Sequence, residues 1–72
     1  MAFARVTIFR ARTNTQIMRK ISSFEGQFTA LLPSGRYYLT IDKRDEHGAY
    51  STVFRSSPFH IHDGYIGRRF TV

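Results

Sequence analysis

Two histidines near the end of the chain have a spacing that could bind a metal. His60 and His62 stand two positions apart, and Asp63 follows them directly. Residues two apart on a strand share a face, so both imidazoles could reach one ion. A third ligand is not evident, although His47 or Asp63 could serve. We therefore favour two solvent-facing histidines at a strand end and expect no metal site.

A second pattern combines arginine with aromatic side chains. The formal net charge is +6, and nine of the eleven basic residues are arginine. The planar donors of arginine suit carboxylates and phosphates, and small β-domains bind single-stranded nucleic acid by stacking bases beside arginines. The candidate contacts for an anion or a partner are Arg5, Phe9, Arg10, Arg12, Tyr38, Arg68 and Arg69.

These residues also have a simpler interpretation. The charges are scattered along the chain, a distribution that favours solubility over a dedicated anion site. Phe9 could cover a sheet edge or a subunit contact. Arg68 and Arg69 are neighbours, so on a strand they point to opposite faces and do not form one patch. Binding of nucleic acid or another polyanion is therefore the alternative to a protein-binding function.

Residue types used in catalysis are present without a catalytic arrangement. The serines have no histidine–acid partners at a supporting spacing, and Asp45 and Glu46 form a charge pair in a loop. Gly64 and Gly67 follow no predicted helix, which excludes a phosphate-binding glycine loop. We expect no catalytic residues, no cofactor and no enzyme activity.

Composition indicates one small globular domain over residues 1–72. The apolar fraction of 42% and eleven aromatic residues argue against disorder, and the absence of cysteine excludes disulfides. No apolar run approaches the roughly 20 residues of a membrane-spanning helix. The N-terminus lacks the pattern of a signal peptide, so we predict none in this chain.

Seven short segments separated by turns must position these side chains. Their residues alternate between apolar and polar or are rich in β-branched and aromatic types, and apolar residues nowhere recur at helical spacing over ten positions. This pattern predicts an all-β fold, a small antiparallel β-sandwich of about seven short strands. The predicted strands cover residues 3–11, 16–22, 27–31, 36–42, 50–55, 59–62 and 68–72.

The segment 24–41 is the clearest hairpin signal, with Gly26 in one turn and Leu32-Pro33-Ser34-Gly35 in the next. The phase of the strand 50–55 stays open, because Tyr50, Thr52 and Phe54 compete with Ser51, Val53 and Arg55 for the inner face. The predicted core comprises Val6, Ile8, Ile17, Ile21, Phe28, Leu39, Ile41, Phe59, Ile61 and Phe70.

Three motifs give the chain a family resemblance: Ala4-Arg5-Val6-Thr7-Ile8, Glu25-Gly26-Gln27-Phe28, and the run from Leu32 to Ile41. In this order the chain resembles the transthyretin-like (prealbumin-like) β-sandwiches, which include carboxypeptidase regulatory-like and CnaB-like domains. The match covers nearly the whole chain. The resemblance implies a non-catalytic structural or binding module, with an extracytoplasmic or cell-envelope location.

Two departures from the family pattern matter. Family members usually have a strand before the segment that starts at Ala4, and its loss would leave a neighbouring strand with an unpaired edge. We therefore expect self-association or completion by a protein partner through that edge.

Self-crosslinking CnaB-like domains join a first-strand lysine to an asparagine near the end. Here arginines occupy the first strand and residues 68–72 hold no asparagine, so we expect no isopeptide bond.

Overall fold

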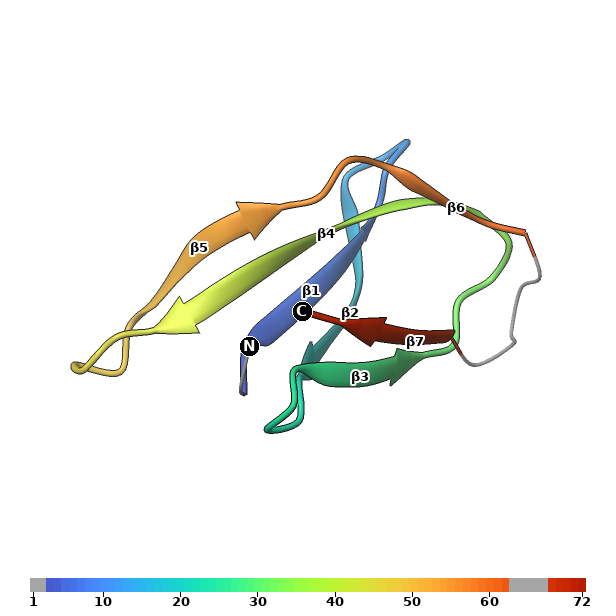
Figure 1. The fold of residues 1–72 in the computed structure, drawn as a ribbon. Coiled ribbons are helices and arrows are strands. Elements are labelled where there is room, and N and C mark those ends of the chain that lie inside the picture. The colour runs from blue at the N-terminus through green and yellow to red at the C-terminus, as the bar shows by residue number, and fades with distance from the viewer. Residues whose placement is uncertain (1–2, 63–67) are drawn as a thin grey trace.

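The computed structural model describes residues 3–62 and 68–72, and this part of the chain forms seven strands and no helix (Figure 1). All strand pairs are antiparallel, so the predicted all-β, sandwich-like fold is confirmed. None of the described residues belongs to a helix capable of crossing a membrane. The strands are β1 (Arg5–Arg10), β2 (Thr15–Ile21), β3 (Gln27–Ala30), β4 (Gly35–Arg44), β5 (Tyr50–Arg55), β6 (Phe59–Ile61) and β7 (Arg68–Thr71).

The larger sheet has the order β2-β1-β4-β5, with β6 also paired to β4. β4 is the longest strand and organises this sheet. One of its edges pairs with β1, while the other pairs first with β6 over 35–37 and then with β5 over 40–44. β4 is therefore covered along both edges, which suits its many buried residues.

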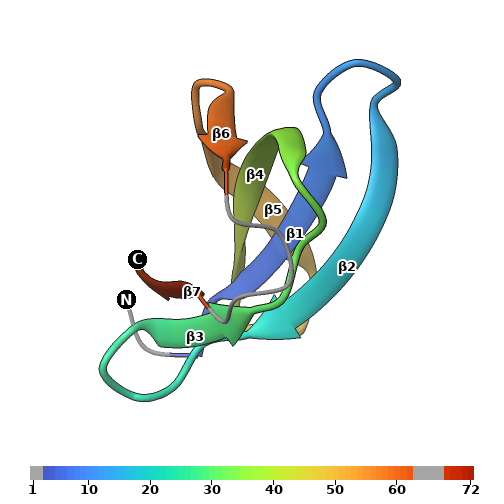
Figure 2. The ribbon, with the colours of Figure 1, turned by 90° about the vertical axis from the view of Figure 1, so that its right-hand side faces the viewer.

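The smaller sheet contains only β3 and β7. Figure 2 shows this pair lying across the end of the larger sheet at which β2 finishes. Phe28 of β3 and Phe70 of β7 are cross-strand partners, and their rings stack with centroids 5.0 Å apart. Phe70 also contacts Phe59 of β6, so the aromatic side chains join the two sheets.

The core lies between the sheets. Its members from the larger sheet include Val6, Ile8 and Leu39, all from the predicted list. Ile17, Phe59 and Phe70 are only partly buried and pack around it. Tyr37 is also fully buried, and its hydroxyl donates a hydrogen bond of 2.7 Å to the Pro33 carbonyl, which satisfies the polar end of the ring. The other buried apolar residues of the core are Ala4, Phe28, Ala30, Leu32, Ile41 and Ile61.

The prediction that Ile21 belongs to the core is wrong. Its side chain is 52% exposed, and it pairs with Arg5, which places it on the outer face of the larger sheet. Met18 pairs with Ile8 and packs against the core instead. A bulge between Ile8 and Phe9 shifts the register, so strict alternation through β2 assigns its faces incorrectly.

A second bulge explains the open phase of β5. Thr52 pairs with Asp42 on the outer face, but Phe54 pairs with Ile41 on the inner face. The register shift between these pairs leaves one extra residue, Val53, on β5. Neither predicted phase holds along the whole strand.

Candidate functional site

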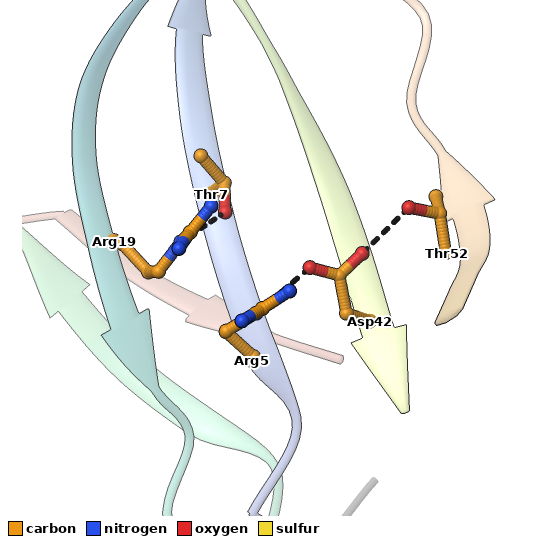
Figure 3. A network of polar contacts seen from close by, with 5 residues as sticks. All are labelled: Arg5, Thr7, Arg19, Asp42 and Thr52. Atoms are coloured by element: carbon orange, nitrogen blue, oxygen red, sulfur yellow. Dashed lines mark hydrogen bonds and ion pairs between the residues drawn. The ribbon is translucent and has the colours of Figure 1, made fainter. Parts of the chain in front are cut away.

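The outer face of the larger sheet holds an ion pair that links three strands (Figure 3). Arg5 of β1 pairs with Asp42 of β4, and its Nε donates a 2.9 Å hydrogen bond to Oδ2. Thr52 of β5 donates a 2.7 Å hydrogen bond to Oδ1 of the same carboxylate. The Arg5 guanidinium also lies 3.8 Å above the ring of Tyr50. The buried carboxylate of Asp42 thus links β1, β4 and β5.

The environment of Asp42 lowers the pKa of its carboxyl below the usual value. The hydrogen bond from Thr52 is the largest cause, and the hydrogen bond and charge of Arg5 act in the same direction. Burial opposes them, since Asp42 is only 5% exposed. The carboxylate is therefore held ionised, as a structural counterion to Arg5.

A second polar contact joins β2 to β1 on the same face. Arg19 donates a 3.0 Å hydrogen bond from Nε to the Thr7 hydroxyl (Figure 3). Thr7 is 1% exposed, so its hydroxyl depends on this partner in place of water. Arg19 itself stays exposed, and its terminal amino groups add positive charge to the face.

Aromatic side chains continue this face toward the β1–β2 turn. Phe9 and Tyr38 are cross-strand partners and stack with centroids 5.0 Å apart. Arg55 lies 4.4 Å above the Tyr38 ring, and the Tyr38 hydroxyl donates a hydrogen bond to Oδ1 of Asn14. Tyr38 is therefore covered by protein groups and is only 7% exposed, which leaves little ring surface for a nucleic-acid base.

The candidate residues separate into three places. Arg5, Phe9 and Tyr38 come together on the outer face just described. Arg10 and Arg12 lie at the β1–β2 turn, where the Arg10 guanidinium is 6.0 Å from the ring of Tyr37. The remaining two, Arg68 and Arg69, belong to β7 in the smaller sheet; Arg69 is exposed, and the side chain of Arg68 lies outside the described residues.

The two histidines lie on and just after β6. Both are exposed, and their rings stack with centroids 5.4 Å apart. His47, the proposed third ligand, lies in the β4–β5 loop at the far end of the larger sheet (Figure 1), while Asp63 falls outside the described residues. Within residues 3–62 and 68–72 no three metal-binding side chains gather.

An apolar cleft opens between the larger sheet and β7. Its volume is about 360 Å³, and no acidic or basic residue lines it. Phe54, on the β5 side, is 51% exposed. The lining residues are Leu39, Ile41, Phe54, Ser56, Phe70, Thr71 and Val72.

The edge of β7 beside this cleft has no strand partner among the described residues, because the smaller sheet contains only β3 and β7. The Val72 amide donates to the Gly26 carbonyl, and the register pairs Phe70 with Phe28. Hydrogen bonding alternates along an antiparallel pair, so the backbone groups of Arg69 and Thr71 point away from β3. This edge therefore presents N–H and C=O groups ready for another strand.

Sequence reasoning missed both central features of these sites. Local sequence patterns do not identify Asp42, which meets Arg5 only through the pairing of β1 with β4. The cleft could not be predicted from local patterns around Phe54, Thr71 and Val72, because residues from three separate strands line it.

Comparisons with protein-family models, curated protein sequences and solved structures give no match to this chain.

Proposed function

We propose that this chain is a non-catalytic binding or assembly module that accepts an extended strand along the open edge of β7. Among the described residues β2, β5 and β6 also have only one strand partner each, but the edge of β7 is singled out because three consecutive residues, 70–72, line the apolar cleft. Exposed sheet edges pair readily with other chains, and natural proteins usually blunt or cover them. Here the edge adjoins an apolar cleft, so an added strand would gain side-chain burial besides backbone hydrogen bonds. The resemblance to transthyretin-like modules supports the same class of function.

The β3 edge of the same sheet provides a contrast. Ser23 donates its amide to the Gln27 carbonyl, and its hydroxyl accepts from the Gln27 amide. The ammonium of Lys20 donates to the Thr29 carbonyl. Because these groups occupy most of the β3 edge, we assign strand binding to β7.

The test uses a synthetic eight-residue peptide that alternates valine with threonine, a neutral probe for strand addition. We expect it to bind the wild-type protein and to fail to bind a Thr71→Pro variant, because proline removes the outward N–H at this position. Thr71→Ala is the matched control, since it keeps the N–H and should still bind. Equal binding to the proline variant and the wild type would contradict the assignment to β7.

A second candidate is polyanion binding by the outer face, favoured by Arg5, Arg19 and Arg55 on one side of the sheet. Tyr38 is covered, so the contacts would be to backbone anions and not to stacked bases. Binding of a single-stranded oligonucleotide that weakens steeply with salt and is lost in Arg19→Gln would favour this function. Salt-independent or absent binding would exclude it.

A further inference from the structure

We infer that the strand accepted by β7 belongs to a partner protein and alternates apolar with acidic residues, the apolar ones entering the cleft. This inference rests on the proposed function and adds the chemistry of the occupant. It follows from three features: the direction of the free backbone groups, the lining of the cleft, and the charges around its mouth.

The backbone of β7 determines where a new strand would lie. Its free groups come from Arg69 and Thr71, so an added strand would run about 4.8 Å from β7, on the side away from β3. On that side the cleft separates β7 from β4 and β5. An added strand would therefore cover the cleft and extend the smaller sheet.

The cleft determines the inward side chains of the occupant. Successive side chains of a strand point to opposite faces, so every second residue would enter between Phe54 and Phe70. Apolar side chains there would cover the half-exposed ring of Phe54 and the edge of Leu39. Burial of this apolar surface favours association. A polar side chain in the same place would lose its water without gaining a charged partner.

The charges around the mouth determine the outward side chains. Arg69 is exposed on β7 and alternates with the inward Phe70, so it lies on the face that the outward side chains of the occupant would share. Glu25 precedes Gly26, which pairs with Val72 at the other end of β7. An acidic residue of the occupant is therefore best placed beside Arg69, at the start of β7. Such complementarity selects between partners more strongly than it adds affinity.

A second copy of this chain fits this site poorly. Each copy carries a formal charge of +6, so two copies repel each other. Among the described strands the only acidic residue is Asp42, which is already paired with Arg5. A strand from another copy would mainly offer arginine, lysine or threonine to Arg69. The occupant is therefore a different, acidic protein segment.

The experiment uses three eight-residue peptides that alternate valine with glutamate, threonine or lysine. It measures the affinity of each peptide for the full chain at low salt. We expect the glutamate peptide to bind about tenfold more tightly than the lysine peptide, since glutamate attracts the Arg69 guanidinium and lysine repels it. The threonine peptide should fall between them, and a salt concentration of about 0.5 M should reduce the difference. Thr71→Pro should abolish binding of all three.

A charge reversal gives the inference a second test. Arg69→Glu should reverse the preference toward the lysine peptide, whereas Arg12→Glu makes the same change of charge in the β1–β2 turn and should preserve the glutamate preference. Equal binding of all three peptides would overturn the acidic occupant while leaving strand addition in place. Self-association of the wild-type chain that Thr71→Pro removes would also overturn it, because the occupant would then be a second copy. If no peptide binds and the chain stays monomeric, the proposed function itself fails.

Discussion

The two sheets of this molecule differ in what they contribute: polar side-chain pairs link the strands of the larger sheet, whereas the smaller sheet borders an apolar cleft. In the larger sheet the side chain of Asp42 is paired with Arg5 and Thr52, and Thr7 with Arg19. In the smaller sheet the outer edge of β7 has no strand partner in the described part of the chain, and Phe54 stands half exposed beside it. The larger sheet also ends in strands with one neighbour, β2 and β5, but three consecutive residues of β7 and its C-terminal end, 70–72, line the cleft, so we propose that another chain completes this edge.

Truncation in the core of the larger sheet should have the largest effect. Ile8 is fully buried, so Ile8→Ala removes packing and leaves a cavity that should lower the free energy of unfolding by about 3 kcal/mol. A domain of this length has about 4–11 kcal/mol of stability in total. Urea unfolding followed by circular dichroism measures the loss.

Ile21→Ala provides the matched control for this core truncation. Its side chain is 52% exposed on the outer face, so the same chemical change should cost far less. Similar losses at both positions would show that the larger sheet does not hold the core described above.

Removal of the buried charge should have the next largest effect. Asp42→Asn keeps the size of the side chain but loses the charge that Arg5 and Thr52 stabilise, at a cost of about 2 kcal/mol. Glu46→Gln makes the same change on a residue exposed in the β4–β5 loop and should leave stability unchanged. If the Asp42→Asn variant were as stable as the wild type, the ion pair would not hold the three strands together.

The same carboxylate should make stability depend on pH. Its pKa is lowered in the folded protein, so the stabilisation is fully present above the unfolded value of about 3.9 and is lost as pH falls through the folded value. Unfolding measured from about pH 7 to about pH 2 should show the difference between the wild type and Asp42→Asn shrinking below about pH 4. A difference that stays constant over this range would contradict the assignment.

Hydrogen exchange tests the comparison with the smallest disturbance, because it needs no substitution. The amides of Arg69 and Thr71 point away from β3 and should exchange faster than those of Phe70 and Val72 on the same strand. Addition of the valine–glutamate peptide should slow the two fast amides. Uniform exchange along β7 in the free protein would indicate that its outer edge is already covered.

Local patterns predicted much of the fold. Leu39 and Ile41 of the predicted core are buried on β4, and each of the seven predicted segments overlaps an observed strand. The inner and outer faces of β2 and β5 were harder to predict. The pairing of each strand with its neighbour includes a bulge, which reverses the alternation of faces partway along the strand. A bulge depends on the pairing partner, which a single segment does not reveal.

The candidate site was less predictable. Arg5, Phe9 and Tyr38 were identified by residue type, and the register places them on one face. The sequence could not show that Arg55 and Phe9 cover Tyr38, nor that β7, which carries Arg69, borders an apolar cleft. These relations connect residues distant in sequence, and they depend on packing between the sheets.

Residue types alone predict the class of structure: short strands, a turn at Gly26, and a basic chain. These properties follow from residue types and spacing along a few consecutive positions. Three features emerge only from the folded chain: the contact of Asp42 with Arg5 across 37 positions, the edge of β7 that has no strand partner among the described residues, and the apolar cleft lined by β7. The reason is that register and sheet packing arise from all strands together, and a one-residue shift would exchange the two faces of any strand.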